Sequence, residues 1–432
     1  MSFHKKTLND IDITGKTVLL RADYNVPLSD NGAVTSDYRL TQSIPTIKAL
    51  QEKNCKIVIT SHLGRPKGVD LSKSLKPVAK KLSTLLKQEV TFVNDCIGES
   101  VEKACEAMKP RDIVLLENVR FHTDEEKHNN EAFAKAIVDS THAEVFVQDC
   151  FGVAHRAHAS IVGPAKLLPA VAGLLIEKEV TTISGVMDNP KRPLMAVIGG
   201  AKIGDKIDII HSFIKLADMV VIGGAMANTF LKAQDIEVGE SLIDEGEIDT
   251  AHDIMDKARS EMKKRKFVFY LPQDSVVVSR MDSNAQVRIV DWDSHVIATL
   301  EANPGRPKPS ASKVLTHEKI VDIGPVSGSF IAGAMQQIET VVWNGTMGVT
   351  EVTSLSDRVG PFAHGTEALI DGLVGRYGNK PFSVLGGGDT TAYIDQRGMN
   401  DMFNHVSTGG GASLELMAGR KLPGVECLQD KE

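Results

Sequence analysis

The sequence is poor in cysteine and lacks long apolar runs, and each shortage excludes a class of protein. Only five of its 432 residues are cysteines, and they form no Cys-x-x-Cys pair. This usage excludes a disulfide-stabilised scaffold and a cysteine-rich zinc site. The longest apolar stretch, 167–176, is about half as long as a membrane-spanning helix. The polar N-terminus also lacks the apolar segment of a signal peptide, so we expect a cytoplasmic protein with no membrane partner.

Positive charge is also in short supply. The chain has 49 Lys and Arg against 56 Asp and Glu, which gives a net charge of −7. This balance excludes a globally basic surface for nucleic acid, and we predict no nucleic-acid partner. Glycine, in contrast, is abundant: the chain has 36 glycines, many of them in pairs and triples. Clustered glycines let the backbone approach a ligand closely, and phosphate is a common one.

Short runs rich in Val, Ile and Leu recur along the chain, separated by helical patterns. Such nearly continuous apolar runs indicate strands that are buried on both faces of a parallel sheet. The predicted strands are 17–20, 56–60, 113–116, 144–148, 194–198, 219–222, 267–271, 319–323, 340–343 and 382–385. Helices are predicted at 75–86, 131–139 and 253–264, among others. The alternation predicts an α/β fold with two doubly wound parallel-sheet lobes, 1–172 and 190–404, joined by a hinge helix at 173–189.

The segments that follow the strands of the first lobe carry arginine or histidine. In open α/β sheets, ligands bind beyond the carboxyl ends of the strands, so these side chains are expected at one edge. The basic residues that follow the strands include Arg39, His62, Arg65, Arg120 and Arg156. Because arginine recognises phosphate and carboxylate through paired N–H groups, the cluster predicts a small, multiply anionic substrate. The alternative is that the arginines pair with Asp23, Glu117 or Asp149.

Glycine-rich turns follow strands in the second lobe. They lie at 199–206, 223–226, 344–348, 386–391 and 407–411. Turns of this kind expose backbone N–H groups at the start of a helix, which suits phosphate, although tight-turn geometry alone is the alternative for any single turn. Five such turns favour a nucleotide. The Walker A pattern is absent because Asp205, not lysine, follows Gly204, and no strand precedes a Gly-x-Gly-x-x-Gly motif.

Three side chains beside these turns are candidates for phosphoryl chemistry. Asp389 follows three glycines and is a candidate Mg²⁺ ligand, because magnesium prefers carboxylate and phosphate oxygens. Lys202 and Lys206 are candidates for holding a phosphoryl group during transfer. His155 and His158 have no carboxylate at a zinc-site spacing, and we predict no transition metal from them.

The chain resembles the phosphoglycerate kinase family along nearly its whole length. The resemblance rests on ordered motifs at 21–28, 61–68, 115–122, 149–160, 199–207, 223–231, 322–325, 342–349, 385–390 and 405–426. It implies two Rossmann-like lobes, with the 3-phosphoglycerate side on the first and the magnesium–nucleotide side on the second. It also implies that the C-terminal tail, 405–432, packs on the first lobe, and that the protein is a monomer.

The resemblance implies a site residue by residue. On the acid side it implies that the substrate is bound by Asp23, Asn25, Arg39, His62, Arg65, Arg120 and Arg156. On the nucleotide side it implies Lys202, Lys206, Gly223, Gly224, Asn344, Glu351, Gly386, Gly387, Gly388, Asp389, Thr390, Gly409, Gly410 and Gly411. Arg39, Lys202 and Lys206 are the implied catalytic residues, and Asp389 is the implied ligand of Mg²⁺.

The implied reaction is the reversible, magnesium-dependent transfer of a phosphoryl group between 1,3-bisphosphoglycerate and ADP, which gives 3-phosphoglycerate and ATP. The alternatives are a catalytically silent nucleotide-binding scaffold and a dehydrogenase. Arg39, Lys202 and Asp389 are all present, which counts against the first, and the missing dinucleotide motif counts against the second.

Several features depart from the family pattern. Cys150 replaces a usual alanine: nearby cations could lower its thiol pKa, or it could be a small buried apolar residue. Thr346 stands where proline is usual after Asn-Gly, which frees one backbone N–H. The segment 276–319 is longer and more polar than the family pattern and has no functional assignment.

Overall fold

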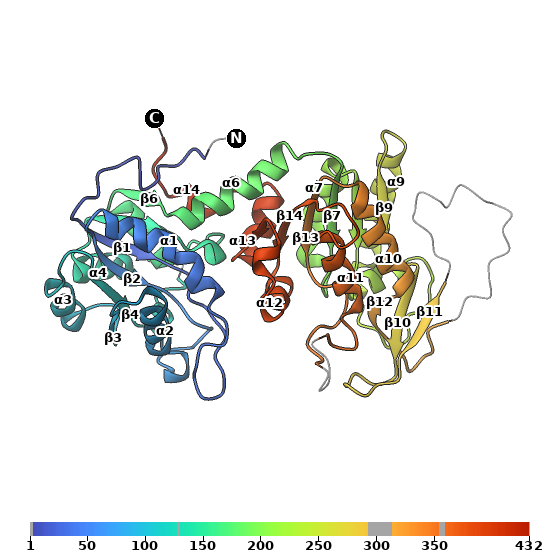
Figure 1. Ribbon diagram of the computed structural model, residues 1–432, viewed down its shortest axis with the longest axis horizontal. Helices are drawn as coiled ribbons and strands as arrows, with labels where there is room; N and C mark the ends of the chain where they lie inside the picture. Colours follow the sequence, from blue (N-terminus) through green and yellow to red (C-terminus); the bar gives the residue numbers. More distant parts are fainter. Residues whose placement is uncertain (1–2, 128–129, 293–312, 354–358, 432) are drawn as a thin grey trace. The chain divides into compact units, whose positions relative to one another are not determined.

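The computed structural model describes residues 3–127, 130–292, 313–353 and 359–431. The chain forms two compact units, which are drawn together in Figure 1. Unit 1 consists of Met1–Ser184, Gly411–Leu416 and Arg420–Glu432. Unit 2 consists of Gly185–Gly410 and Met417–Gly419. The boundary between the units lies within helix α6 (Leu174–Asp188).

A six-stranded parallel sheet is the centre of unit 1. Its strand order is β3-β4-β2-β1-β5-β6. The strands are β1 (Thr17–Arg21), β2 (Lys56–Thr60), β3 (Thr91–Val93), β4 (Ile113–Leu116), β5 (Val145–Gln148) and β6 (Ala170–Ala172). Every residue of β4 and β5 is buried, as expected for a sheet with both faces covered. The strand order reverses between β1 and β5, and the carboxyl ends of strands at such a switch point are where ligands bind.

Helices alternate with these strands. They are α1 (Tyr38–Glu52), α2 (Lys76–Leu86), α3 (Glu99–Glu106), α4 (Glu131–Thr141) and α5 (Ala159–Val162). The two ends of the chain also meet in unit 1, where Lys5 pairs with Asp430 through backbone bonds (Figure 1). The short helix α14 (Pro423–Glu426) packs against α5, so the C-terminal segment is part of this unit.

Unit 2 contains a second six-stranded parallel sheet, with the order β15-β14-β13-β7-β8-β9. Its strands are β7 (Leu194–Ile198), β8 (Met219–Ile222), β9 (Val268–Tyr270), β13 (Thr340–Asn344), β14 (Phe382–Gly386) and β15 (His405–Val406). Counted within the unit, this is the 3-2-1-4-5-6 order of the dinucleotide-binding fold. The switch point lies between β7 and β13, and the loops that follow these two strands are the glycine-rich ones.

The helices of unit 2 are α7 (Ile207–Leu216), α8 (Met226–Lys232), α9 (Ile248–Met262), α10 (Pro325–Ala334), α11 (His364–Leu373) and α12 (Gly388–Gln396). Helix α13 (Gly410–Met417) is shared between the units, and its residues Gly411–Leu416 belong to unit 1. Unit 2 also contains a small antiparallel sheet with the strand order β11-β10-β12, and its strands come between β9 and β13 along the chain. Its strands are β10 (Asp274–Val278), β11 (Arg288–Asp291) and β12 (Lys319–Ile323).

The prediction of two α/β lobes with parallel sheets is confirmed. One predicted strand has a different partner than expected, because 319–323 forms β12 of the antiparallel sheet. The predicted tail begins at residue 405, whereas β15 pairs with β14 in unit 2 and the chain enters unit 1 at Gly411. Within the segment 276–319, residues 293–312 lie outside the described part of the chain. Among the described helices, none is both long and apolar enough to cross a membrane.

Candidate functional site

The basic residues of unit 1 lie at the carboxyl ends of β1, β2, β4 and β5, as the sequence predicts. Asp23, two residues beyond β1, is 4% exposed and anchors this group. Its Oδ1 accepts hydrogen bonds from the Arg39 guanidinium at 3.2 Å and from the Asn25 backbone at 3.1 Å. Its Oδ2 is buried and has no hydrogen-bond partner. An orphaned carboxylate oxygen of this kind is costly unless a ligand donates to it.

Arg39 and Asn25 are fixed by their contacts with the loop after β1. Arg39 Nη1 also donates to the Asn25 carbonyl oxygen at 2.8 Å. Asn25 Oδ1 accepts from the Gly64 N–H at 2.8 Å, which joins the loops after β1 and β2. The alternative stated for the arginines is therefore correct in part, because Arg39 pairs with Asp23. Glu117, in contrast, accepts from Ser74, Leu75 and Asn118.

His62 and Arg120 form the buried centre of the basic group. His62 is 1% exposed and Arg120 is 7% exposed. Burial, together with the charges of Arg21, Arg120 and Arg39, holds the pKa of His62 well below its usual range. Arg120 donates to the Gly64 carbonyl at 2.6 Å and pairs with Glu126 at 3.0 Å. The imidazole is therefore neutral at physiological pH, and the arginines carry the positive charge.

The other two predicted basic residues are solvent-exposed at the same sheet edge. Arg65 follows β2, and its charge acts on Arg120; Arg156 follows β5, and its charge acts on His158. A cavity of about 390 Å³ adjoins this edge and is lined by Asn25, Leu63, Gly64 and Lys73, among others. Gly64, which lines the cavity, directly precedes the exposed Arg65, so this edge of the sheet has room for an anionic ligand.

Two further cations of this group are Arg21, which the sequence places directly after the first predicted strand but which was not among the predicted site residues, and Lys73, which was not predicted at all. Arg21 is the last residue of β1 and is 1% exposed. It donates to Ser160 Oγ at 2.8 Å, lies 3.4 Å from His62 Nδ1 and lies 3.8 Å from the buried Glu125. An arginine that ends an otherwise apolar strand was the available signal. Lys73 lines the cavity from the separate turn Leu71–Lys73, which does not directly follow a strand, so no sequence pattern pointed to it.

The glycines of unit 2 let three loops come together at the switch point. Gly224 has φ +64°, and a Cβ there would lie 2.4 Å from the Gly200 nitrogen. Gly345 has φ +95°, and a Cβ there would lie 2.3 Å from the Gly199 carbonyl carbon. A Cβ on Gly223 would lie 2.3 Å from Met347 Sδ. Only glycine at these positions lets the loops after β7, β8 and β13, with the Met347 side chain, approach one another this closely.

The loop after β14 joins the same group. Thr390 is fully buried, and its Oγ1 accepts a hydrogen bond from the Gly345 N–H at 2.8 Å. Asn344, at the end of β13, is 2% exposed, and its Nδ2 is buried with no hydrogen-bond partner. Gly386 ends β14, Gly387 is the N-cap of α12, and Gly388 begins α12 with open space where a Cβ would stand. A helix start, an unpartnered amide and open space together suit a phosphate.

Lys206 and Asp389 are charged groups of this region that act on each other electrostatically. Lys206 Nζ donates a hydrogen bond to the Gly199 carbonyl oxygen. Burial lowers the pKa of Lys206 to about 8, against the opposing effect of the charges on Asp389 and Asp205. Lys202, four residues earlier, has an exposed side chain. The two lysines therefore differ, since one is held within the loop and the other is open to solvent.

A cavity of about 410 Å³ lies beside these loops. Its lining includes Gly200, Gly224, Asp322, Thr346, Glu351 and Asp389. Of these lining residues, Gly224, Glu351 and Asp389 were predicted to bind the nucleotide. Asp322 was predicted only as the first residue of the motif at 322–325. The triplet at 409–411 is divided between the units: Gly410 belongs to unit 2, and Gly411 belongs to unit 1 beside His155.

A comparison with known protein families decides the class of the protein. The model of the family described as phosphoglycerate kinase matches residues 8–420. The chain belongs to the phosphoglycerate kinase family. It is therefore an enzyme, a phosphotransferase, and its activity is that of phosphoglycerate kinase. The resemblance stated from the sequence is confirmed.

Similar proteins match over their full length. The phosphoglycerate kinase of Dictyoglomus turgidum is 42% identical over 430 residues, which cover 99% of this chain and 100% of that protein. The cytosolic phosphoglycerate kinase of Triticum aestivum is 42% identical, with 98% of each chain covered. Among solved structures, phosphoglycerate kinase from Pyrococcus horikoshii superposes with a TM-score of 0.81 at 29% identity, with 98% of each chain covered. The Coxiella burnetii structure gives 0.77 at 33%, with the same coverage.

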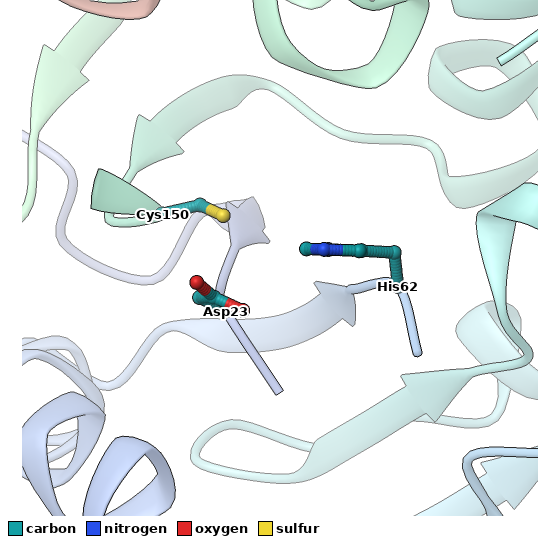
Figure 2. Close-up of side chains that lie close together, drawn as sticks. All are labelled: Asp23, His62 and Cys150. Atoms are coloured by element: carbon teal, nitrogen blue, oxygen red, sulfur yellow. The ribbon is translucent and has the colours of Figure 1, made fainter. Parts of the chain in front are cut away.

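Cys150 is the residue at which this chain departs from the phosphoglycerate kinase pattern inside the basic group. Figure 2 shows its sulfur beside the Asp23 carboxylate, with the His62 ring pointing toward both. The Arg21 guanidinium lies 3.7 Å from the sulfur. Complete burial nevertheless raises the pKa of the Cys150 thiol to about 12, and the lowering effect of Arg21 is smaller. Of the two interpretations left open, the structure favours a small, unreactive, buried residue.

We therefore expect Cys150→Ala to keep near-normal kcat and KM. The thiol is protonated at physiological pH, and thiol reagents attack the thiolate. Native protein should accordingly show no labelling of Cys150 by iodoacetamide on a time scale that labels an unfolded control, as measured by peptide mass spectrometry. Rapid labelling of Cys150 in the folded protein, with loss of activity that Cys150→Ala resists, would show a reactive cysteine instead.

Proposed function

We propose that unit 1 binds 3-phosphoglycerate or 1,3-bisphosphoglycerate through its basic group, and that unit 2 binds ATP or ADP with Mg²⁺ through its glycine-rich loops. The reaction is the reversible transfer of a phosphoryl group from 1,3-bisphosphoglycerate to ADP. The observation that carries the acid side is the cluster of cations around the buried, half-satisfied Asp23. The phosphate and carboxylate groups would be bound by Arg39, Arg65, Arg120 and Arg156. Asp23 would accept a hydrogen bond from the glycerate hydroxyl, and Asn25 would donate one to it.

His62 would contribute a neutral hydrogen bond to the same ligand. The depressed pKa of its imidazole is caused by burial and by surrounding arginines. A neutral ring can donate from one nitrogen while the other accepts, so His62 can orient a substrate oxygen without adding charge. Arg21, which lies 3.4 Å from His62 Nδ1, would hold the ring in place.

The nucleotide side is supported by the backbone geometry of the loops. Gly223 and Gly224 would form the floor of the base pocket, because any side chain there would fill the space beside Met347 and Gly200. Glu351 lines the cavity and would accept from the ribose hydroxyls. The phosphates would be held by Asn344 and Thr390 and by the N–H groups of the two glycine triplets, Gly386–Gly388 and Gly409–Gly411.

The residues present fit a magnesium ion. Asp389 offers an exposed carboxylate in the first turn of α12, at the wall of the cavity. Magnesium is usually held by one or two carboxylates together with substrate phosphates and water. When bound, the ion neutralises phosphate charge and orients the phosphates. Asp389 would hold it on the side of the nucleotide.

Phosphoryl transfer needs positioning and charge more than a base. The nucleophile is already an anion, either the ADP phosphate or the glycerate carboxylate, so no proton must be removed. The transferring group spreads its charge over three oxygens, and preorganised cations stabilise that charge. Arg39 from unit 1 and Lys202 from unit 2 would contact these oxygens, and Lys206 would support the loop through its bond to Gly199.

A coupled assay tests the function directly. The chain, with ATP, Mg²⁺ and 3-phosphoglycerate, should form ADP at a rate that depends on all three. A nucleotide-binding scaffold would bind ATP with no turnover, and a dehydrogenase would need a nicotinamide cofactor. Replacing 3-phosphoglycerate with 2-phosphoglycerate is the matched control, since the charges are equal and only the position of the phosphate changes. Equal rates with both acids would contradict the proposed substrate.

We further propose that the helix at 173–189 is a hinge. Ligands held on separate units can react only when the transferring atoms come within about 3–3.5 Å. Binding of both ligands should therefore lower the radius of gyration measured by small-angle scattering, whereas either ligand alone should have a smaller effect. An unchanged scattering curve with both ligands present, under conditions where calorimetry shows both bound, would contradict this proposal.

The lowered pKa of Lys206 predicts an alkaline limit to activity. In the free enzyme the ammonium form is lost as pH rises through about 8, because burial disfavours the charged form. We therefore expect kcat/KM for the nucleotide to fall above that pH, since kcat/KM reports the free enzyme. Lys206→Arg keeps its charge and should lose this limb of the profile whatever its absolute rate. The same limb in both proteins would assign it to another group.

We propose a cytosolic monomer. The Triticum aestivum relative is described as cytosolic, and all residues proposed for both ligands come from a single chain. Size-exclusion chromatography with light scattering gives the mass, which should match one chain of 46.7 kDa.

A further inference from the structure

A second group of possible metal ligands lies in unit 1, in the loops that follow β3 and β4. Asp95 and Cys96 follow β3, and His122 follows the turn η2 (Val119–Phe121). Their ligand atoms, a carboxylate oxygen, a thiol sulfur and an imidazole nitrogen, all lie within 4.8 Å of one another. We propose that Asp95, Cys96 and His122 form a binding site for a divalent transition metal of the zinc class.

The chemistry of these three groups favours such a metal over magnesium. Sulfur and imidazole nitrogen are ligands for Zn²⁺ and Co²⁺, whereas magnesium takes oxygen ligands. With Zn–S near 2.3 Å and Zn–N near 2.0 Å, tetrahedral ligand atoms stand about 3.5 Å apart. The ligand atoms lie within 4.8 Å of one another, and His122 Nε2 and Asp95 Oδ1 lie 2.9 Å apart, so a small rearrangement would bring the three atoms to this spacing. Three protein ligands leave a fourth position for water.

The loops hold two of the ligands close together already. His122 Nε2 and Asp95 Oδ1 are hydrogen-bonded at 2.9 Å, and Cys96 Sγ donates to the Glu117 carbonyl oxygen at 2.9 Å. The Asp95 carbonyl accepts from the Glu117 N–H at 3.3 Å, which ties the first loop to the end of β4. The His122 ring also packs against Phe133, with ring centroids 5.0 Å apart.

Access and charge both suit a cation. Cys96 is fully buried, but the side chains of His122 and Asp95 are 29% and 46% exposed, so the site opens to solvent on one side. The charged groups that act on the Cys96 sulfur are chiefly Asp95, Glu117 and Glu125, with Arg21 as the weaker opposing charge. A divalent ion would therefore enter a region of negative potential.

The other cluster of this kind among the described residues is Asp23, His62 and Cys150, shown in Figure 2. Cations surround that cluster: Arg21, Arg120 and Arg39 act on His62, and Arg21 contacts Cys150. These cations would repel a metal ion, and the cluster lies within the proposed substrate site. The contrast in charge makes Cys150 the matched control for Cys96.

Binding at the proposed site exchanges a proton for the metal. The Cys96 S–H proton leaves to solvent as the thiolate coordinates, and the hydrogen bond between His122 and Asp95 opens. The imidazole keeps one proton, on Nδ1, when Nε2 coordinates. No oxidant or reductant is needed.

Cobalt titration of the full chain tests the site, because a cobalt thiolate gives an intense near-ultraviolet charge-transfer band. Chelator-treated protein in excess Mg²⁺ should bind one Co²⁺ with this band, and Zn²⁺ should displace it. Cys96→Ser should lose the band, and Cys150→Ala should keep it. His122→Asn should raise the dissociation constant for Co²⁺ about tenfold or more, and its unchanged kinase activity would show that it folds.

Other outcomes would overturn the site. If the wild-type protein gave no charge-transfer band, or if Mg²⁺ abolished the band, Cys96 would not be a thiolate ligand of the metal and the proposal would be wrong. Loss of the band in Cys150→Ala but not in Cys96→Ser would place the metal in the substrate site. If Cys96→Ser does not fold, His122→Asn decides alone: unchanged affinity would contradict the proposal. Kinase activity serves here only as the folding control for His122→Asn, and the metal-binding readouts do not depend on it.

Discussion

Lys202→Ala is expected to lower kcat by a factor on the order of 10²–10³, with a much smaller change in KM for ATP. Lys202 follows Gly199, Gly200 and Ala201 directly after β7, so the rigid strand fixes where its side chain begins. Its side chain is exposed, and it can reach an oxygen of the transferring group without first breaking a buried contact. The loss corresponds to about 3–4 kcal/mol of transition-state stabilisation, as for other preorganised electrostatic groups.

Steady-state kinetics on two variants separate this role from binding. Asp389→Ala should weaken the binding of the magnesium–nucleotide as well as turnover, because it removes the carboxylate that would hold the ion. Lys215→Ala, an exposed lysine on α7, is the control for a general change in surface charge and should behave as wild type. A Lys202→Ala enzyme with near-normal kcat and a greatly raised KM would make Lys202 a ground-state binding residue.

The buried strands could be predicted from the sequence because their burial shows as unbroken apolar runs. The bounds of β2, β4, β7, β8 and β12 match the predictions. The short edge strands β3 and β6, with three residues each, gave no such run. Apolar content also does not show which strands are neighbours. The prediction therefore counted 319–323 among the strands of a parallel sheet, whereas it forms β12 of the antiparallel sheet.

The types of residue at the site could be predicted, but their burial could not. The position of Arg39 and His62 after strands was enough to place them at the sheet edge. Neighbouring cations lower the pKa of the Cys150 thiol and burial raises it, and only the structure shows how deeply the thiol is buried. The effect of burial is the larger one. Arg21 was not predicted as a site residue, because its position at the end of β1 does not show that it is enclosed by Ser160, His62 and Glu125.

The two sheets explain why the motifs of each unit converge. In both, the loops after strands on either side of the switch point face one crevice, and each unit therefore needs only short loops to assemble its site. In unit 2 the convergence depends on backbone, since Gly199, Gly224 and Gly345 approach more closely than side chains allow. In unit 1 it depends on side-chain pairs, chiefly that of Asp23 and Arg39.

Arg39→Ala should lower kcat on the order of 10²–10³, as the acid-side counterpart of Lys202. Arg39 is 27% exposed, and its Nη1 is already oriented by Asp23 at 3.2 Å and by the Asn25 carbonyl at 2.8 Å. A guanidinium held this way has little to reorganise when charge develops on the transferring group. Arg39→Lys keeps the charge but loses the planar fork, and it should recover only part of the rate.

The same substitution also removes the cationic partner of the buried Asp23, so stability must be measured beside kinetics. Urea unfolding should show a lower free energy of unfolding for Arg39→Ala, because the Asp23 carboxylate loses its charge partner in a buried setting. Lys135→Ala, which removes an exposed pair with Asp139 on α4, should change neither stability nor kcat appreciably. If Arg39→Ala unfolds as wild type does and raises KM for 3-phosphoglycerate without lowering kcat, then Arg39 binds the substrate and has no special role in the transition state. If kcat falls while the protein remains folded at the assay temperature, the loss belongs to the transfer step, because the fraction of folded enzyme is unchanged.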